Sequence, residues 1–338
     1  MPMTHKVAII GCGKILPRHI EAIEENTQFE LTALCDTDDT IRPSLNSHNV
    51  PVYSDYKELM NKEDVTLAVI ATPNAMHYAQ AKYFLENGCD VLIEKPATLN
   101  PKLSRNLHKI AKDNGTRAYA VLQVRLNPVV SALKKLLESG DLGNVRGVSL
   151  TQRWQRPIEY FSDWRGDPSL GGGTLHECGI HYLDIVCHLF GKPKVLSSSS
   201  FNTKHKNITI EDTVYALFDF GHFGGTSEVT ISSEPKNIEC SISIMTEFCF
   251  IRLGGKSLDK ILEAKFTDNN LKIKNRYDKI ISNMKNARTA NSYGDYSGSC
   301  PNHPELYSKL EKFDISVSFE CLELIEEIYK QCGRKYHE

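Results

Sequence analysis

The stretch Lys6-Val-Ala-Ile-Ile-Gly-Cys-Gly13 decides the fold of this chain. Its apolar residues run into two glycines, a pattern that predicts a buried strand followed by a tight turn. The next apolar run, Phe29-Glu-Leu-Thr-Ala-Leu-Cys-Asp36, ends in a carboxylate. A third, Asp90-Val-Leu-Ile-Glu-Lys-Pro-Ala97, ends in one cation beside a proline. Together they predict a dinucleotide-binding domain with an amine at the rim of its sheet.

Short apolar runs alternate with helical patterns through the first third of the chain. The predicted strands are 6–10, 29–36, 65–71, 89–94 and 117–122. The predicted helices between them are near 15–26, 55–62, 75–88 and 101–114. This alternation implies a parallel sheet with right-handed crossovers.

The pattern changes after residue 122. Helices are predicted near 128–139, 174–190 and 314–332, and residues 256–290 are interpreted as a lysine-rich, solvated excursion. Six strands that alternate apolar and polar residues are typical of a sheet with one covered face, namely 145–154, 195–200, 213–220, 225–232, 238–245 and 248–253. We therefore expect an α/β Rossmann domain over 1–122, and an α+β domain with a large open, mainly antiparallel sheet over 123–338, which binds substrate and oligomerises.

Composition narrows the partners. The chain has 338 residues and a formal net charge of −2, which favours neither nucleic acid nor an anionic membrane. Its ten cysteines include no Cys-x-x-Cys pair and are expected to be reduced core thiols, and no metal is expected. No apolar run approaches the ~18 residues of a membrane helix, so a cytoplasmic protein is predicted.

The first glycine turn predicts the cofactor. Gly11 and Gly13 permit the turn and bring backbone amides to a pyrophosphate, although Leu16 replaces the usual third glycine. Asp36 is placed to accept hydrogen bonds from the adenosine ribose and would repel a 2′-phosphate. NAD is therefore expected in preference to NADP, with Arg42 as the residue that argues the other way.

More polar residues follow the next predicted strand. Thr72-Pro73-Asn74 lies where ligands bind open α/β sheets, and it can also cap the following helix. His77, in the first turn of that helix, faces either cofactor or solvent.

The second chemical stretch is a run of three glycines, Gly171–Gly173, that leads into a predicted helix. At 3.6 residues per turn, Glu177 and His181 share a face with Asp184 close by, which suggests a base with an orienting carboxylate. A structural role for His181 is the alternative. A metal site with His176 is excluded, because a spacing of five puts the two histidines about 140° apart around the helix.

These residues resemble a known family. The glycine turn, Glu94-Lys95-Pro96, and the triple glycine with Gly179-Ile-His181 resemble the glucose-fructose oxidoreductase, inositol dehydrogenase and rhizopine catabolism family over most of the chain. Four segments are similar to the branch that oxidises C3 of UDP-N-acetylglucosaminuronic acid, for amino sugars of bacterial surface polysaccharides. They are Ile15-x-Pro17-Arg18-His19, Leu122-Gln123-x-Arg125, Trp164-x-Gly166-Asp167-Pro168 and Gly179-Ile180-His181-x-x-Asp184.

The resemblance implies that NAD lies between the first domain and the second sheet, with Lys95 and His181 beside the reacting carbinol. The implied cofactor contacts are Gly11, Gly13, Lys14, Ile15, Asp36, Thr72, Pro73, Asn74, His77, Glu94, Lys95, Gln123, Trp164 and Arg165. The implied contacts with a sugar-nucleotide substrate are Lys95, Arg125, Arg156, Tyr160, Glu177, Gly179 and His181.

Two positions depart from the family pattern. Relatives carry Asp or Asn in place of Glu177, so this residue either acts directly in catalysis or clamps a sugar hydroxyl. The branch has Asn-Trp in place of Ile158-Glu159, which adds a negative charge where a uronate is expected to bind. Three arginines are candidates to offset that charge, namely Arg153, Arg156 and Arg165.

The expected reaction is hydride transfer from a sugar C–H to NAD while a base removes the hydroxyl proton. A histidine with the ordinary pKa of about 6.5 is largely neutral near pH 7, which makes His181 the first choice of base. Lys95 would stabilise the developing alkoxide, although the two roles can be exchanged.

Two alternatives stay open at this point. The substrate can be another sugar or cyclitol, such as UDP-N-acetylglucosamine, glucose or inositol, or the chain can be a non-catalytic NAD-binding sensor. A homodimer or homotetramer built on the second sheet is expected in every case.

Overall fold

The computed structural model describes residues 4–255, 257–267, 271–284 and 302–334. The chain forms two compact units, Met1–Leu122 with His303–Phe319, and Gln123–Asn302 with Glu320–Glu338. The second domain expected from the sequence runs without interruption from residue 123 to residue 338. In the structure, residues 303–319 belong to the first unit instead. The physical reason is a packing contact: α10 (His303–Ser308) lies against α1 (Leu16–Glu24) and buries Tyr307.

The first unit contains a six-stranded parallel sheet in the order β3-β2-β1-β4-β5-β6, which confirms the predicted Rossmann sheet. Apolar residues fill its central strands, and every residue of β4 is buried. The strand β3 was not predicted, because two residues are too few to show an apolar pattern. The strands are β1 His5–Ile10, β2 Phe29–Cys35, β3 Val52–Tyr53, β4 Leu67–Ile70, β5 Asp90–Ile93 and β6 Ala118–Ala120.

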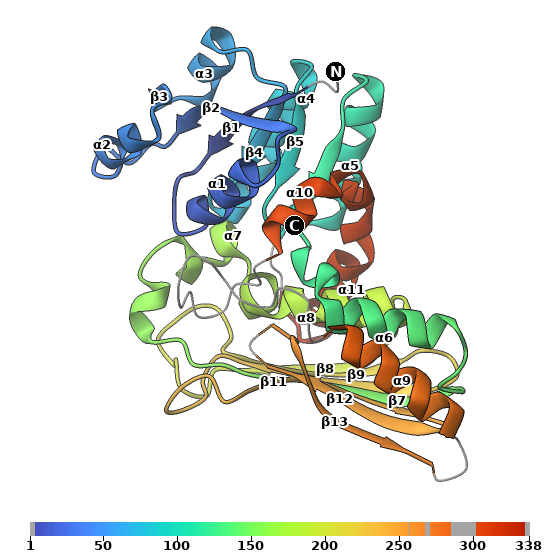
Figure 1. Cartoon of the computed structure of the whole chain (residues 1–338). Helices are drawn as coiled ribbons and strands as arrows, with labels where there is room; N and C mark the ends of the chain where they lie inside the picture. The colour runs from blue at the N-terminus through green and yellow to red at the C-terminus, as the bar shows by residue number, and fades with distance from the viewer. Residues whose placement is uncertain (1–3, 256, 268–270, 285–301, 335–338) are drawn as a thin grey trace. The chain divides into compact units, whose positions relative to one another are not determined.

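Local signals start the helices of this unit. Pro17 occupies the first turn of α1, and Asn100 accepts a hydrogen bond from the Lys102 amide at the start of α5. The further helices are α2 Arg42–Leu45, α3 Tyr56–Lys62, α4 His77–Glu86 and α5 Pro101–Asp113, with short 3₁₀ turns at η1 Asn46–His48, η2 Asn74–Met76, η7 Leu310–Phe313 and η8 Ile315–Ser318. Figure 1 shows α1 and α10 beside one another in this unit.

The second unit contains a seven-stranded sheet in the order β13-β12-β11-β7-β10-β9-β8. Its pairs are antiparallel except β10 with β7, so the expectation of a mainly antiparallel sheet is confirmed. The strands are β7 Val145–Arg153, β8 Lys194–Phe201, β9 Thr213–Asp219, β10 Gly224–Thr230, β11 Glu239–Thr246, β12 Cys249–Gly254 and β13 Lys260–Phe266.

Helices cover one face of this sheet (Figure 1). The longer helices of this unit are α6 Pro128–Glu138, α8 Ile180–Phe190, α9 Leu271–Met284 and α11 Phe319–Gln331. Its short helical turns, not all of which lie on the sheet, are α7 Pro168–Gly171, η3 Gln123–Leu126, η4 Ile158–Phe161, η5 Trp164–Gly166 and η6 Leu175–Gly179. The solvated excursion predicted for 256–290 is wrong where it is described, because β13 joins the sheet and α9 buries Ile273 and Tyr277 in the core. Residues 285–290 lie outside the described residues.

The opposite face of the second sheet is partly apolar. In β9, Val214, Ala216 and Phe218 are buried, whereas the alternating Tyr215 and Leu217 are exposed. Other large apolar side chains exposed on strands of this sheet are Leu196, Phe201, Met245 and Leu262. Within the described part of the chain, no helix has both the length and the apolar character needed to cross a membrane.

Candidate functional site

The glycine turn after β1 has the geometry of a phosphate-binding loop. Gly11 has φ +94°, and a Cβ there would lie 2.6 Å from the backbone of Ala71, so only glycine fits. A Cβ at Gly13 would meet nothing within 4 Å, which leaves room for a ligand to approach the backbone. Leu16, in place of the third glycine, is buried in the core.

Asp36 follows β2 and holds this turn. Its Oδ2 accepts a hydrogen bond from the Cys12 amide at 2.7 Å, and its Oδ1 accepts one from the Asp38 amide at 2.9 Å. A carboxylate offers about four acceptor positions, so Asp36 retains capacity for ribose hydroxyls. The residues present therefore fit a dinucleotide, with its pyrophosphate at the turn and its adenosine ribose at Asp36.

Arg42 is engaged by its own loop. Its Nη1 donates to the carbonyls of Asp36 and Thr37, both at 3.2 Å, and its Nη2 pairs with Asp39. These contacts reduce its availability to a 2′-phosphate, which favours NAD. Of two neighbours of the turn, Lys14 is exposed and Ile15 is partly buried, and their cofactor contacts stay predictions.

The carboxyl ends of β4 and β5 are linked by one buried histidine. His77 places Nδ1 2.9 Å from the carbonyl of Pro96 and Nε2 2.8 Å from the carbonyl of Thr72. Burial lowers its pKa, although both carbonyls act in the opposite direction. The expectation that His77 faces cofactor or solvent does not match these contacts, and we reinterpret it as the residue that positions the Thr72 and Lys95 loops.

The rest of this edge is compact. Thr72 donates from Oγ1 to Gln80 at 2.6 Å, Pro73 is partly buried and precedes η2, and Asn74 is buried within it. Because Gly11, Asp36, Thr72 and Glu94 all follow parallel strands, they lie at the same edge of the sheet.

Glu94 joins Lys95 to a buried histidine network. Its Oε1 lies 3.2 Å from His19 Nε2 and 3.4 Å from His303 Nε2, and its Oε2 accepts from the Lys95 amide at 3.1 Å. Burial alone raises the pKa of Glu94, but the hydrogen bonds from both histidines outweigh it and hold that pKa well below its ordinary value. Tyr307 completes the network through His19 Nδ1 at 2.9 Å. No local sequence pattern indicates His303, because it lies 209 residues from Glu94 in the chain.

Among the described residues, the same three side chains form the group whose ligand atoms lie close enough together to be considered for a metal ion, within 4.8 Å of one another. A structural zinc site has four protein ligands, and a catalytic one keeps a position open to solvent. This group offers only three ligands, and all three are buried, so it fits neither type of zinc site. We therefore interpret them as a hydrogen-bonded network that fixes the backbone at Lys95, whose side chain is partly exposed.

In the second unit, the predicted regular helix over 174–190 begins instead with a π turn, η6, and continues as α8. The cause is tertiary. Buried Glu211 accepts from the Thr174 amide at 2.8 Å, and the Tyr329 hydroxyl accepts from the Leu175 amide at 2.8 Å while it donates to Glu211. Such single π turns are common at functional sites. Glu211 and Tyr329 were missed from the sequence because neither lies near the glycines in the chain.

Glu177 sits in the π turn within a group of aromatic and charged side chains. The Tyr160 hydroxyl donates to its Oε1 at 2.6 Å, and Arg165 Nε lies 3.4 Å from the same oxygen. Burial raises the pKa of Tyr160 well above its ordinary value, so it remains a hydrogen-bond donor. Arg165 also stacks on Trp164 at 4.4 Å. These contacts favour Glu177 as an anchor of this loop over a direct catalytic partner.

Arg125 and Asp184 form a buried ion pair. Arg125 donates from Nε and Nη2 to the two carboxylate oxygens, at 2.8 and 2.6 Å, and Asp184 is 1% exposed. This bidentate pair joins η3 to α8. The pair supports a structural role for Arg125 in place of the predicted substrate contact. Asp184, which was expected to orient His181, instead binds Arg125.

The remaining predicted residues have distinct environments. Gly179 is buried, and a Cβ there would lie 3.1 Å from Leu175 and 3.3 Å from Val229, so it allows close packing on β10. Gln123 is buried and its carbonyl accepts from Asn302 at 3.2 Å. His181 is partly exposed beside Tyr182. The cofactor contacts of Gln123, Trp164 and Arg165 and the substrate contact of Gly179 stay predictions.

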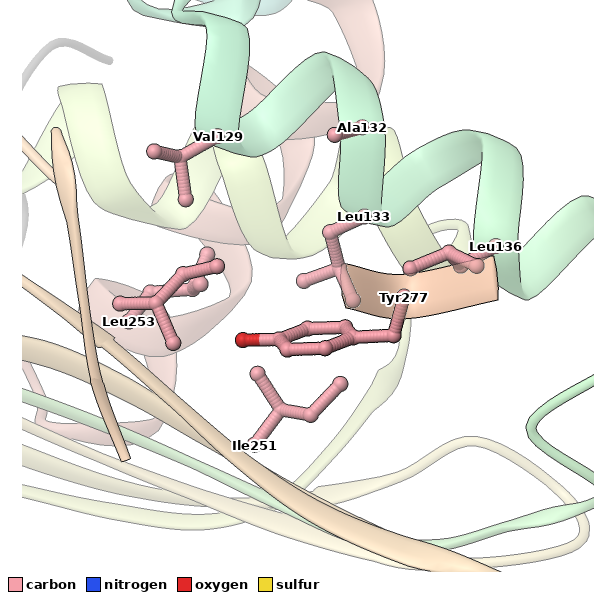
Figure 2. Close-up of a pocket in the computed structure, with 8 residues that line it drawn as sticks. Val129, Ala132, Leu133, Leu136, Ile251, Leu253 and Tyr277 are labelled. Atoms are coloured by element: carbon pink, nitrogen blue, oxygen red, sulfur yellow. The ribbon is translucent and has the colours of Figure 1, made fainter. Parts of the chain in front are cut away.

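A small apolar cavity lies elsewhere in the second unit, between α6, α9 and β12 (Figure 2). Its volume is about 10 Å³, roughly the space of one water molecule. In Figure 2 the ring of Tyr277 lies between Leu133 and Ile251. Because of its small size and apolar lining, we interpret the cavity as a packing feature and not as a metabolite site.

The first unit is thus built for a dinucleotide, and a glycine-led helix in the second unit carries a partly exposed imidazole. This combination is that of a dinucleotide-dependent oxidoreductase. Residues 5–122 match the family model described as "Oxidoreductase family, NAD-binding Rossmann fold", and residues 130–247 match the "GFO/IDH/MocA C-terminal domain". The chain belongs to the Gfo/Idh/MocA oxidoreductase family, and its cofactor is NAD.

Curated relatives align over part of their length. A trans-1,2-dihydrobenzene-1,2-diol dehydrogenase from Oryctolagus cuniculus is 32% identical over 225 residues, which cover 64% of this chain and 62% of the relative. The scyllo-inositol 2-dehydrogenase (NADP(+)) IolW from Bacillus subtilis is 26% identical over 170 residues, which cover 50% of this chain and 47% of the relative. The chain thus spans between about half and two thirds of the length of these two proteins.

Two solved structures are similar over nearly the whole chain. The WlbA dehydrogenase from Bordetella pertussis, in complex with NADH and UDP-GlcNAcA, is 26% identical with a TM-score of 0.84, and the match covers 98% of this chain and 96% of that one. The WlbA dehydrogenase from Chromobacterium violaceum, also with NADH and UDP-GlcNAcA, is 25% identical with a TM-score of 0.85, covering 98% and 95%.

Proposed function

We propose that this protein oxidises the C3 hydroxyl of UDP-N-acetylglucosaminuronic acid to the ketone with NAD, in the cytoplasm, for amino-sugar synthesis in bacterial surface polysaccharides such as the lipopolysaccharide O-antigen. The observation that carries the proposal is the similarity over 98% of the chain to the WlbA dehydrogenase of Bordetella pertussis, solved with NADH and UDP-GlcNAcA. Lys95 and His181, the two ionisable residues that the proposed chemistry needs, are both partly exposed.

When bound, NAD supplies the acceptor for the hydride that leaves C3. In the proposed mechanism, His181 takes the proton of the C3 hydroxyl, because an imidazole near neutral pH can accept it. Lys95, as an ammonium, stabilises the negative charge that develops on that oxygen. The products are the 3-keto sugar, NADH and one proton.

The roles of Lys95 and His181 can be exchanged, since a lysine beside a positive nicotinamide can also act as the base. The pH dependence of turnover in the two single variants separates the assignments, because the variant that lacks the base loses the ionisation that limits the rate at low pH.

Other residues hold this machinery in place. Glu94 fixes the Lys95 amide and is itself held by two histidines, while His77 ties the Lys95-Pro96 loop to Thr72. In the second unit, Tyr160 anchors Glu177 in the turn that leads into the helix of His181. A site with its acid and base fixed in advance avoids reorganisation during the reaction.

The test is NADH production with three candidate substrates: UDP-N-acetylglucosaminuronate, UDP-N-acetylglucosamine and myo-inositol. We expect turnover with the first to exceed the other two clearly. Lys95→Ala and His181→Ala should each bind NAD normally and lose about 10²- to 10⁴-fold in turnover. Normal turnover in either variant would remove its assigned role.

A second candidate function is oxidation of a different sugar or cyclitol. It is favoured by similarity to the scyllo-inositol 2-dehydrogenase IolW. Greater turnover with myo-inositol or with UDP-N-acetylglucosamine in the same assay would support it. Tight NAD binding without turnover on any of the three would instead favour a non-catalytic sensor.

A further inference from the structure

The helix that carries His181 does not start as an α-helix. Residues Leu175–Gly179 form the π turn η6, and α8 begins directly after it with His181 in its first turn. A π turn takes up one residue more than an α-helical turn. Because each residue of an α-helix rotates by about 100°, His181 lies about 100° around the axis from where an uninterrupted α-helix would place it. The π turn therefore sets the direction of this side chain relative to the residues before the turn.

Two buried side chains bind the backbone at the start of the π turn. The hydroxyl of Tyr329, on α11, accepts from the Leu175 amide at 2.8 Å and donates to Glu211 Oε1 at 2.6 Å. The same oxygen of Glu211 accepts from the Thr174 amide at 2.8 Å, and the Glu211 carbonyl accepts from the Thr174 hydroxyl. Glu211 is 0% exposed and Tyr329 is 3% exposed, so water does not readily replace a lost bond.

The ring of Tyr329 has a separate task. It stacks on the ring of His176 with 5.5 Å between the centroids and 26° between the planes. His176 also packs closely on Gly172, where a Cβ would lie 2.7 Å from its Nδ1. The ring thus maintains packing within the turn, whereas the hydroxyl holds the backbone. Replacement by phenylalanine separates the two contributions.

The contacts on the other side of the turn hold a side chain and not the backbone. Tyr160 donates to Glu177 at 2.6 Å, and the guanidinium of Arg156 lies 5.3 Å from the Tyr160 ring. Arg156 Nη1 donates to the Gln155 carbonyl at 2.8 Å. The substrate contact expected for Arg156 stays a prediction. None of these bonds reaches an amide of the turn, so they do not determine its path.

The far side of the π turn is fixed as well. Arg125 binds both carboxylate oxygens of Asp184, in the second turn of α8. Tyr329 and Glu211 hold one end of the segment and Arg125 the other, with His181 between them. An uncommon backbone geometry persists only where its surroundings determine it. Loss of the Tyr329 hydroxyl removes one of these constraints and allows the turn to relax towards an α-helix.

We propose that Tyr329 is a positioning residue of the reaction: its hydroxyl, together with Glu211, maintains the π turn and thereby the orientation of His181. This inference rests on the proposed function, since it concerns the group assigned as the base. A contribution of Tyr329 to stability alone is the competing explanation, and the test must separate the two.

The kinetic experiment compares Tyr329→Phe with wild type and with Tyr277→Phe. Tyr277 is the matched control, a buried tyrosine of the same unit that lines the small apolar cavity. We expect Tyr329→Phe to lower kcat about 10- to 100-fold, because a displacement of about 1 Å has effects of this size. KM for UDP-N-acetylglucosaminuronate should change less than about 3-fold, since no substrate contact is removed. Tyr277→Phe should leave kcat unchanged.

Hydrogen exchange tests the turn itself and needs no substrate. The amides of residues 174–179 should exchange at least about 10-fold faster in Tyr329→Phe than in wild type, because the bond to the Leu175 amide is lost. The later turns of α8 should exchange as in wild type. Tyr277→Phe should leave the exchange at 174–179 unchanged.

Unchanged kcat, or unchanged exchange at 174–179, in Tyr329→Phe overturns the proposal. An equal loss of kcat in Tyr277→Phe also overturns it, because the effect would then reflect stability. A parallel loss of NAD affinity in Tyr329→Phe does the same, since it would indicate misfolding. If wild type oxidises UDP-N-acetylglucosamine or myo-inositol instead of the uronate, the proposed function fails, while kcat on that substrate still decides Tyr329. If wild type oxidises none of the three, both proposals fall.

Discussion

At the residue scale, the cofactor edge depends on a few side chains with two tasks each. Asp36 holds the glycine turn through the Cys12 amide and keeps acceptor capacity for a ribose. Glu94 holds the Lys95 amide and accepts from two buried histidines. Substitution at either position should therefore affect both local order and ligand binding.

Asp36→Ser is expected to weaken NAD binding by about 10-fold, because charge-assisted hydrogen bonds to the ribose are lost. The same change removes the repulsion of a 2′-phosphate, so the ratio of NADP to NAD affinity should rise. Titration of both cofactors by intrinsic fluorescence measures this. A variant with unchanged affinity for NAD would contradict the assignment of Asp36 to the ribose.

The identities of these residues were accessible from the sequence, but several of their partners were not. Gly11, Asp36 and Lys95 end apolar runs in a parallel sheet, and such ends share one edge whatever the rest of the chain does. His303 reaches Glu94 across 209 residues of chain, and the bidentate pair of Arg125 with Asp184 spans 59. No local pattern encodes either contact.

At the element scale, α8 is positioned from both sides. Glu211 and Tyr329 fix the amides at the start of the π turn that precedes it, and Arg125 binds Asp184 within the second turn of α8. The sequence predicted a helix here but not the π turn, because the turn results from contacts with distant residues. The return of 303–319 to the first unit was unpredicted for the same reason.

Removal of one partner of the buried pair between η3 and α8 should be strongly destabilising. Arg125→Met leaves Asp184 buried without its cation, at a cost of about 3–5 kcal/mol in the free energy of unfolding. The double variant Arg125→Met/Asp184→Leu should recover most of that loss, since no charge stays buried. Chemical denaturation gives both values, and a single variant as stable as wild type would disprove the structural role.

His188, near the end of α8, predicts a pH dependence of stability. Lys134 Nζ lies 3.3 Å from its Nδ1, and burial, with help from the charges of Arg125 and Lys134, lowers its pKa to about 3. In the unfolded chain a histidine has a pKa of about 6.5, so the unfolded state binds more protons between these values. Stability is therefore present above about pH 6.5 and declines as the pH falls through this window.

Burial lowers the pKa of His19 and His77 too, so both add to the same trend. Denaturant titrations from about pH 7.5 to about pH 5.5 should show a decrease in unfolding free energy, and His188→Gln should make the decrease shallower. Substitution of the exposed His222 serves as the control. A wild-type stability that rises on acidification through this range is incompatible with neutral buried histidines.

At the scale of the whole molecule, the second sheet exposes an apolar face that suits a second copy of the chain. Tyr215 and Leu217 of β9, with Leu196 and Phe201 of β8, are each more than 40% exposed. Apolar patches of this kind on a sheet commonly mark an interface between subunits. The dimer or tetramer expected from the sequence is therefore proposed to use this face.

Light scattering of wild type should give the mass of a dimer or tetramer, and Leu217→Glu should reduce it, because a charge would be buried against an apolar partner surface. Met76→Glu, at an exposed apolar residue of the first unit, is the matched control and should leave the mass unchanged. A monomeric wild type, or equal effects of the two variants, would remove the proposed interface.

The proposed function depends on one step, the transfer of hydride from C3 of an N-acetylated uronate attached to UDP. The most direct measurement uses that substrate with deuterium at C3 and determines the mass of the reduced cofactor after one turnover. We expect deuterium in the nicotinamide ring with wild type, and, within the time of one wild-type turnover, almost none with His181→Ala or Lys95→Ala. Reduced cofactor without deuterium, or no reduced cofactor at all, would contradict it.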